Sequence, residues 1–225
     1  MPHRAYRSTY GPPSLTYPPV LATLSHMDTI REIILASGSP RRKDLLEQAG
    51  YTFRVTVSDV EETDTGNDDP AQTARRNAAM KAWAVAKSSP HSAIVIGADT
   101  IVVLDGRIFG KPANAIEAKG TLQTLSGRTH QVITGVCVIT EGQEHTFAET
   151  TNVRFRSLTP EEIDAYVATG EPLDKAGAYG IQGAGRALVD RIEGDYDNVV
   201  GLPITRLKRA LDFKSGDKID DGKHT

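Results

Sequence analysis

The sequence predicts an α/β fold with a mixed β-sheet flanked by helices, and three observations support this. The 225 residues are 39% hydrophobic and 24% charged, which is typical of a globular domain with one sizeable core. Short apolar runs, typical of buried strands, alternate with helical segments. Two hairpins, with turns at Asp105-Gly106 and Glu141-Gly142, interrupt the alternation, which favours a mixed sheet over a purely parallel one.

Turn and capping residues delimit the elements of the first half. Gly50 ends the first helix, and Asp69 is expected to cap the second, with Pro70 at its first position. We expect, in order, a strand at 33–36, a helix at about 41–49, a strand at 51–57, an acidic loop at 58–69, an alanine-rich helix at 70–87, a buried strand at 93–98, and a second strand leading into the first hairpin.

The second half ends its elements in the same way. Thr159-Pro160-Glu161-Glu162 is a capping box with proline at the first helical position, and Gly170 ends that helix. The expected elements are a helix at about 114–125, a long hairpin at 131–140 and 145–155, a helix at about 160–169, a glycine-rich loop at 174–185, a strand at 188–192 and a helix at 203–211.

The chain divides into one domain and two tails. Residues 1–28 lack a strong period and carry no acidic residue before Asp28, so we expect a disordered N-terminal extension. An organelle transit peptide is an alternative, and so is a start codon placed before the true one at Met27. Residues 29–212 form the expected domain, and the charged residues 213–225 form a flexible tail.

Charge and cysteine content exclude several classes of protein. The net charge of −3 and the pI near 6.1 disfavour a nucleic-acid or anionic-membrane partner, so a phosphate site must consist of a few placed cations. The single cysteine, Cys137, forms no intrachain disulfide and fits a reducing compartment. No apolar run reaches the ~20 residues of a membrane span. We therefore expect a cytoplasmic protein, or an organellar one if residues 1–27 are a transit peptide.

A candidate phosphate site follows the first strand. The hydroxyls of Ser37 and Ser39, together with backbone N–H groups at a helix N-terminus, can surround an anion. Arg41, Arg42 and Lys43 occupy the first helical turn, where the helix dipole disfavours cations unless a polyphosphate is bound. The segment lacks the ending of a Walker loop and the glycines of a dinucleotide fingerprint. A basic surface cluster behind a serine cap is the alternative.

Two carboxylates are candidates for metal binding. Asp99 is expected at the end of an apolar strand, where ligands collect in open α/β sheets, although such a residue can also be a turn former. Glu62 follows Glu61 in an acidic loop that could equally be solvated. Mg²⁺ takes oxygen donors and needs only one or two carboxylates in addition to substrate phosphates. No histidine pair has the spacing of zinc ligands.

Three further polar residues have local contexts that suit a binding site. Lys111 lies between glycine and proline, which constrains its backbone, whereas Lys81 lies on the alanine-rich helix and could simply face solvent. Gln182 is framed by glycines, and its amide can both donate to and accept from a base edge. Without a nucleophile elbow, the inventory favours direct attack by water, activated by a metal and a carboxylate.

Together these segments resemble the Maf family from about Ile33 to Leu211. Each segment is moderately specific, but their order and spacing are highly specific. The residues that carry the resemblance are Ala36-Ser37-Gly38-Ser39-Pro40-Arg41-Arg42, Glu62, Lys81, Gly97-Ala98-Asp99-Thr100, Gly110-Lys111-Pro112, Leu125-Ser126-Gly127-Arg128-Thr129-His130 and Asp174-Lys175-Ala176-Gly177-Ala178-Tyr179-Gly180-Ile181-Gln182-Gly183.

The resemblance implies a fold similar to that of inosine triphosphatase, with two lobes and a central cleft. It implies hydrolysis of a nucleoside triphosphate to the monophosphate and pyrophosphate, with Mg²⁺ or Mn²⁺ as cofactor and a homodimer as the assembly. Asp99, Glu62, Lys81 and Lys111 match activity-linked positions, and Ser39 and Arg42 match the phosphate motif. Arg41, Thr100 and Gln182 match the branch that prefers dTTP, UTP and some modified pyrimidine nucleotides.

Three other functions remain open from the sequence. A non-catalytic nucleotide-binding regulator of cell division would bind a triphosphate without releasing pyrophosphate. An interaction module would use the basic loop only as a surface and would bind no nucleotide. A purine-selective enzyme, such as a 7-methyl-GTP pyrophosphatase, would share the reaction, but the identities of Arg41, Thr100 and Gln182 disfavour it by resemblance.

Overall fold

The computed structural model describes residues 31–60 and 69–212. The predicted extension at 1–28, the predicted tail at 213–225, and both Glu61 and Glu62 lie outside the described residues. In the part that is described, no helix combines the length and apolar character needed to cross a membrane.

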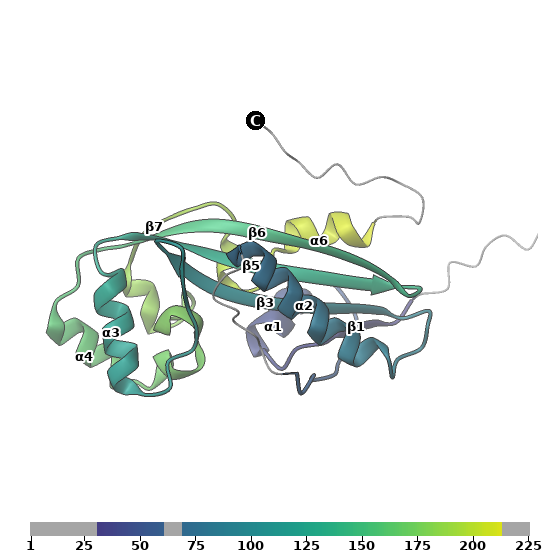
Figure 1. Ribbon diagram of the computed structural model, residues 1–225, viewed down its shortest axis with the longest axis horizontal. Helices are drawn as coiled ribbons and strands as arrows, with labels where there is room; N and C mark the ends of the chain where they lie inside the picture. The colour runs from purple at the N-terminus through teal and green to yellow at the C-terminus, as the bar shows by residue number, and fades with distance from the viewer. Residues whose placement is uncertain (1–30, 61–68, 213–225) are drawn as a thin grey trace, which may run out of the picture. The chain divides into compact units, whose positions relative to one another are not determined.

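The described residues form a seven-stranded mixed sheet in the order β2-β1-β3-β5-β6-β7, with β4 paired to β3 (Figure 1). The pairs β1–β2 and β1–β3 are parallel, and the remaining pairs are antiparallel. The strands are β1 (Ile33–Leu35), β2 (Phe53–Val55), β3 (Ile94–Leu104), β4 (Arg107–Phe109), β5 (Thr129–Thr140), β6 (Gln143–Phe155) and β7 (Val189–Glu193).

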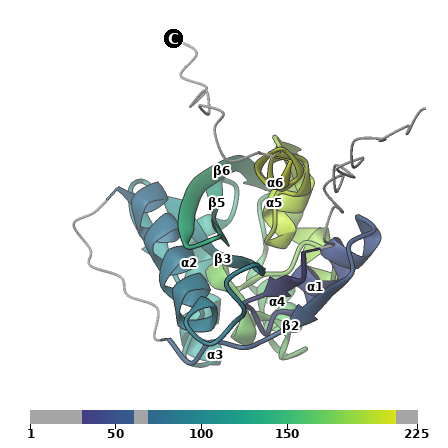
Figure 2. The ribbon, with the colours of Figure 1, turned by 90° about the vertical axis from the view of Figure 1, so that its right-hand side faces the viewer.

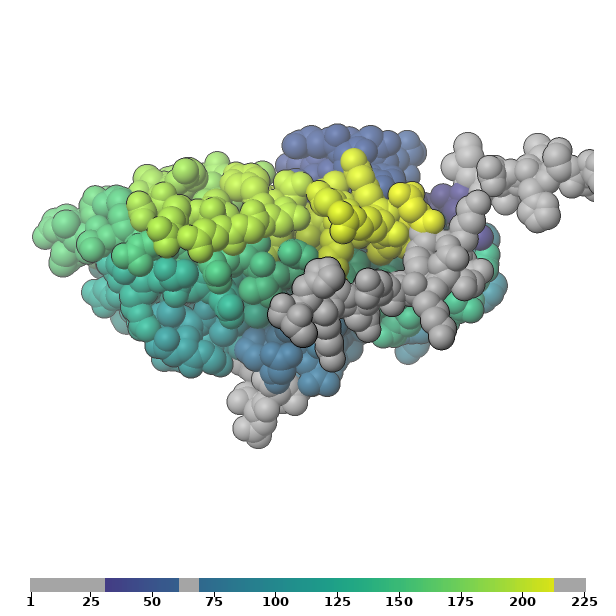
Figure 3. Space-filling view, turned by 90° about the horizontal axis from the view of Figure 1, so that it is seen from above, coloured from purple at the N-terminus to yellow at the C-terminus, as the bar shows by residue number. Residues whose placement is uncertain are grey.

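Helices cover both faces of the sheet. Figure 2 shows α2 on one side and α1, α5 and α6 on the other, and Figure 3 shows the C-terminal segments in yellow beside α1 in blue. In Figure 1, α3 and α4 lie together at one end of the long strands, and α1 lies nearer their middle. The helices are α1 (Pro40–Gln48), α2 (Pro70–Ala86), α3 (Ala115–Leu125), α4 (Pro160–Val167), α5 (Tyr196–Val200) and α6 (Ile204–Leu211).

The partner strands of β3 leave part of its edge uncovered. Parallel pairing with β1 ends where Leu35 lies beside Ile96, and antiparallel pairing with β4 begins where Phe109 lies beside Val102. Between these points, residues 97–101 of β3 have neither β1 nor β4 beside them. The loops that leave β1 and β4 therefore both start at this gap.

Helix α2 lies directly against the backbone of two strands. A Cβ atom added to Gly97 would come within 2.2 Å of the Ala78 carbonyl oxygen, and one added to Gly135 would come within 2.2 Å of the Ala74 carbonyl carbon. Its buried residues recur at helical spacing and are Thr73, Ala74, Asn77, Ala78, Lys81, Ala82 and Val85. Small residues on both surfaces thus allow the close approach, and Cys137 is buried beside them.

Most of the predicted elements are present. Both hairpin turns are confirmed, with positive φ at Asp105 and Glu141 as well as at the glycines that follow them. The capping box at Thr159 is also confirmed, since its hydroxyl accepts from the Glu162 N–H while the Glu162 carboxylate accepts from the Thr159 N–H. The mixed sheet flanked by helices agrees with the predicted fold class.

Two details of the predicted elements are wrong. The strand at 93–98 and the strand expected after it are one continuous strand, β3, because β5 pairs with it along its whole length. Asp99 is therefore in mid-strand, just past the end of parallel β1, and not at a strand end. Helix α5 was not predicted, although Asp195 caps it by accepting from the Asp197 and Asn198 N–H groups.

The contact between α2 and β3 predicts opposite effects for two glycine-to-alanine substitutions. Gly97→Ala should lower the free energy of unfolding by about 2–3 kcal/mol, since its methyl group meets helix backbone that cannot move alone. Gly120→Ala, in α3 with open space around it, should be neutral or stabilise by up to about 1 kcal/mol. Urea unfolding measures both, and equal effects would contradict the close approach.

Candidate functional site

A cleft of about 440 Å³ opens at the uncovered edge of β3. Its lining comes from the loop after β1, from Asp99 and Thr100 on β3, from the loop after β4, and from residues 174–181. The loop after β1 leads into α1, whereas residues 174–181 follow α4 and belong to the group of helices that packs around α3. The two lobes with a central cleft that the family resemblance implied are thus present.

The wall after β1 presents hydrogen-bond donors to the cleft. The Ser37 hydroxyl oxygen accepts hydrogen bonds from the Ser39 N–H, at 3.2 Å, and from the Arg42 guanidinium, at 3.0 Å. Ser39 is at the N-cap of α1, but its side chain makes no capping hydrogen bond. The first-turn N–H groups of a helix have no partner within the helix. This N-terminus therefore presents N–H groups and a hydroxyl to the cleft.

Arg42 is held in one position by three neutral oxygens. Its guanidinium donates to the Gly201 carbonyl oxygen at 2.8 Å, to Ser37 Oγ at 3.0 Å and to Thr100 Oγ1 at 3.0 Å. Its positive charge also acts on the Asp99 carboxylate, and a fixed side chain has little rotamer freedom left to lose when a ligand binds. Arg42 is thus a pre-positioned cation in the wall of the cleft.

The hydroxyl proton of Thr100 has a defined direction. Thr134 Oγ1 donates to the Asn198 carbonyl oxygen at 2.9 Å, so its own proton is committed. The 2.9 Å contact between the two threonine hydroxyls must then run from Thr100 to Thr134. Thr100 Oγ1 also accepts from Arg42. A hydroxyl has one donor and two acceptor lone pairs, so Thr100 can only accept from a ligand.

A buried ion pair lies on the α2 side of β3. Asp99 is 3% exposed, and its Oδ1 atom accepts from Lys81 Nζ at 2.7 Å while its Oδ2 atom accepts from Asn77 Nδ2 at 3.1 Å. Asn77 and Lys81 are four residues apart and so lie on one face of α2. Gly135 is the cross-strand neighbour of Asp99, and its missing side chain brings the helix within reach.

The surroundings of Asp99 determine its charge. Burial by itself would raise its pKa, but the Lys81 ammonium, the Arg42 guanidinium and the Asn77 amide hold that pKa below its ordinary value. Asp99 is therefore a carboxylate at neutral pH. It keeps acceptor capacity beyond the two contacts given above, because a carboxylate has about four lone-pair sites.

The structure brings together eight of the ten predicted site residues. Those that line the cleft are Ser37, Ser39, Arg41, Arg42, Lys81, Asp99, Thr100 and Lys111. Gln182 is exposed and is not part of the lining, although its neighbour Ile181 is. Glu62 lies outside the described residues.

Sequence reasoning missed several residues that shape the cleft. Asn77 had a detectable signal, because it is four residues before Lys81 on the buried stripe of α2. Asp174 and Lys175 line the cleft, and Lys175 Nζ donates to Asp174 at 2.6 Å. Thr134 and Asn198 had no local signal, since their role depends on strands and turns that are distant in sequence.

The donor set suits a hard divalent cation that is bound mainly by its substrate. The described residues contain no group of three or more His, Cys, Asp or Glu side chains that could hold a metal on its own. Asp99 offers carboxylate oxygens in the cleft, and Mg²⁺ commonly takes one or two carboxylates together with substrate phosphates. The residues present therefore fit such an ion, with phosphate as a necessary part of the site.

A buried histidine supports one wall of the cleft. His130 is 1% exposed, and its Nε2 atom lies 2.9 Å from the hydroxyl of Tyr179, which lines the cleft. The His130 ring also meets the rings of Phe155 and Tyr179 edge-on. Burial lowers the pKa of His130 to about 4, so the ring is neutral at physiological pH.

The chain is similar to one protein family and to several named relatives over most of its length. A family model described as "Maf-like protein" matches residues 32–213. A dTTP/UTP pyrophosphatase of Bacillus cereus (strain AH820) is 57% identical over 182 residues, which cover 81% of this chain and 95% of that protein. A dTTP/UTP pyrophosphatase of Bacillus cytotoxicus is 56% identical over 188 residues, or 83% and 98% of the two chains. The solved Ham1 protein of Staphylococcus aureus matches with a TM-score of 0.48 and 20% identity, covering 80% and 98%.

The neutral state of His130 predicts a pH dependence of stability. Its folded pKa, about 4, is below the ordinary 6.5, so its stabilising contribution is complete above pH 6.5 and is lost as the pH falls toward 4. At 1.36 kcal/mol per pH unit this amounts to about 3 kcal/mol. Between pH 7 and 4, wild type should lose about that much more unfolding free energy than His130→Gln in urea titrations. The exposed His91→Gln serves as control, and parallel curves for wild type and His130→Gln would refute the assignment.

Proposed function

Because the chain belongs to the family of Maf-like proteins, we propose that it hydrolyses nucleoside triphosphates to the monophosphate and pyrophosphate, with dTTP and UTP preferred. The observation that carries the proposal is a buried carboxylate, Asp99, held by Lys81 in a cleft that is also lined by the serines of the loop after β1 and the first-turn arginines of α1. Relatives that match this chain over 95% or more of their own length are named for that reaction. Modified pyrimidine nucleotides are further candidate substrates.

The wall after β1 suits the triphosphate. Ser37, Ser39 and the N-terminus of α1 would hydrogen-bond phosphate oxygens, and Arg42 would supply a fixed charge. Arg41 and Lys111 line the same cleft and would neutralise the charge that develops on the leaving group.

Hydrolysis needs one water molecule and one broken bond. The water oxygen would bond to the α-phosphorus while the bond from that phosphorus to the α,β-bridging oxygen breaks, so that pyrophosphate leaves and the water proton passes by way of Asp99 to solvent. Asp99 would accept a hydrogen bond from the water and orient it, with Lys81 and Asn77 fixing the carboxylate. Asp99, with Glu62, would hold Mg²⁺ or Mn²⁺, which when bound supplies positive charge at the phosphates and acidifies a water molecule.

Hydrogen-bond direction supports a preference for thymine and uracil over cytosine. Thymine and uracil carry an N3–H donor, whereas the N3 atom of cytosine is an acceptor. Thr100 can only accept, so it would bind the thymine or uracil edge and leave cytosine N3 without a donor. Gln182 would read the remaining polar groups of the base through its amide. We also propose, on the family resemblance, a homodimer in the cytoplasm.

The reaction and the role of Asp99 can be tested together. Wild type with Mg²⁺ should release pyrophosphate, with label from ¹⁸O-water in the monophosphate. Asp99→Asn should lower kcat at least about a hundredfold, since positioned acid–base groups contribute 10²–10⁴-fold. It also removes the carboxylate that binds Lys81, so a thermal unfolding curve must show a folded variant. Asp44→Asn, an exposed carboxylate on α1, is the control.

Each outcome of this assay decides a specific point. Orthophosphate with diphosphate as products would refute the proposed bond cleavage. A folded Asp99→Asn variant within threefold of wild type would remove Asp99 from the mechanism. Nucleotide binding without any product would favour a non-catalytic regulator, and 7-methyl-GTP as the best substrate would favour the purine-selective alternative.

The direction of the Thr100 hydroxyl predicts a change in base selection. Thr134→Val keeps the side-chain shape but removes the acceptor that takes the Thr100 proton, so Thr100 could then donate to cytosine N3. The ratio of kcat/KM for dTTP over dCTP should fall by about tenfold, within the 1–3 kcal/mol that one such contact is worth. The exposed Thr205→Val on α6 is the control. An unchanged ratio in a folded Thr134→Val variant would exclude this selection device.

A further inference from the structure

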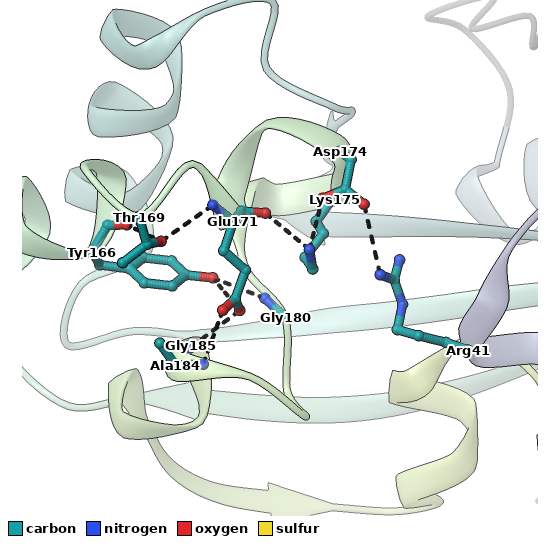
Figure 4. A network of polar contacts seen from close by, with 9 residues as sticks. All are labelled: Arg41, Tyr166, Thr169, Glu171, Asp174, Lys175, Gly180, Ala184 and Gly185. Atoms are coloured by element: carbon teal, nitrogen blue, oxygen red, sulfur yellow. Dashed lines mark hydrogen bonds and ion pairs between the residues drawn. The ribbon is translucent and has the colours of Figure 1, made fainter. Parts of the chain in front are cut away.

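The carboxylate of Glu171 is enclosed by a backbone loop far from it in sequence. Its Oε2 atom accepts from the Ala184 N–H at 2.9 Å, and its Oε1 atom accepts from the Gly185 N–H at 3.3 Å (Figure 4). The Tyr166 hydroxyl donates to the same Oε1 at 2.9 Å. Both oxygens of Glu171 are thus used as acceptors, by donors from α4 and from residues 184–185.

Tyr166 connects this carboxylate to the other end of the loop. Its phenol oxygen accepts from the Gly180 N–H at 3.1 Å while its proton goes to Glu171. Burial, which has the largest effect, and the nearby Glu171 carboxylate raise the pKa of Tyr166 well above its ordinary value. The phenol therefore keeps the proton that it donates. Residues 180–185, which we call the 180–185 loop and which lead into a 3-10 helix at Ala184–Leu188, are therefore anchored at both ends to one carboxylate.

Three glycines of the 180–185 loop allow this enclosure. A Cβ atom on Gly183 would lie 2.4 Å from Glu171 Oε2, and one on Gly185 would lie 2.6 Å from the Tyr166 hydroxyl. One on Gly180 would lie 2.6 Å from Lys175 Cε and 2.9 Å from Glu171 Oε1. Because these three positions have no side chain, the loop can lie directly against Glu171 and its neighbours.

The anchored loop borders the cleft. Gly180 and Ile181 line it, and exposed Gln182 follows directly. The backbone of Glu171 has a second link to the cleft, since its carbonyl oxygen accepts from Lys175 Nζ at 2.9 Å. Figure 4 shows the whole connection, from Tyr166 and the glycines on one side to Asp174 and Arg41 on the other.

We propose that Glu171 is a positioning residue for base selection, whose carboxylate fixes the 180–185 loop so that Ile181 and Gln182 meet the nucleotide base in one geometry. The inference rests on the proposed function, because it assumes that the base is bound beside this loop. Glu171 itself is not among the residues that line the cleft. Its effect is on which nucleotide is accepted and not on the hydrolytic step at Asp99.

The test uses substitutions that keep side-chain size. Glu171→Gln has one acceptor oxygen in place of two, so an NH₂ group must face the Ala184 or the Gly185 N–H. Tyr166→Phe keeps the ring and removes only the hydroxyl that links Gly180 to Glu171. Glu161→Gln on α4 is exposed and is the matched control. Pyrophosphate release is measured with dTTP, UTP, dCTP and dGTP for all four proteins.

The expected result is a loss of selectivity with catalysis retained. In Glu171→Gln the ratio of kcat/KM for dTTP over dGTP should fall about tenfold, mainly through the KM for dTTP, while kcat for dTTP stays within about threefold. Tyr166→Phe should show the same change to a smaller extent, about threefold, and Glu161→Gln should match wild type.

Other outcomes separate this inference from the proposed function. Equal losses for all four nucleotides, or an unchanged ratio, would show that Glu171 is only structural and would overturn the inference while wild-type activity stands. If Glu171→Gln does not fold, the ratio in Tyr166→Phe decides, and an unchanged ratio there has the same meaning. Absence of pyrophosphate release or of a pyrimidine preference in wild type would instead refute the proposed function.

Discussion

Helix α2 touches the backbone of β3 and β5, and the geometry of the site depends on this contact. At Gly97 and Gly135 the strands have no side chains, so the helix approaches closely enough for Asn77 and Lys81 to reach the Asp99 carboxylate. Removing one partner of a buried ion pair lowers the stability of the fold strongly, because it leaves a buried charge without compensation. The complete pair, with the hydrogen bond from Asn77, avoids this loss. The packing of α2 against the sheet therefore also keeps Asp99 ionised and fixes the orientation of its carboxylate.

The position of the cleft follows from an interruption in the sheet. Strand β3 continues past the end of β1 and pairs with β4 only from Val102 onward, so its middle part has a free edge. Loops from β1 and from β4 leave the sheet at this edge and bring hydroxyls, N–H groups and Lys111 to the same space. Ligands in open α/β sheets collect outside the carboxyl ends of strands, and here the end of parallel β1 provides that location.

Neighbouring groups determine what several polar side chains can do. The Thr134 hydroxyl already donates to Asn198, so the Thr100 hydroxyl must donate to Thr134 and can only accept from a ligand. Arg42 is a fixed cation because three neutral oxygens hold its guanidinium. The Glu171 carboxylate organises backbone N–H groups that are more than ten residues away. In each case the donor and acceptor inventory of a residue is general, but its use depends on partners that are distant in sequence.

The sequence alone determined the local features of this protein. Capping residues, turn glycines and hydrophobic periodicity predicted most elements and both hairpins, and family motifs pointed to eight residues that the cleft contains. The sequence pattern placed Asp99 at a strand end, which is wrong. An apolar run does not show how far a neighbouring strand, here β5, continues to pair with it. Only the tertiary structure showed that Asn77 completes the Asp99 pair, that Thr134 sets the direction of the Thr100 proton, and that Glu171 holds the 180–185 loop. These roles come from hydrogen bonds between segments 14 to 64 residues apart, and no local pattern encodes which segments will meet.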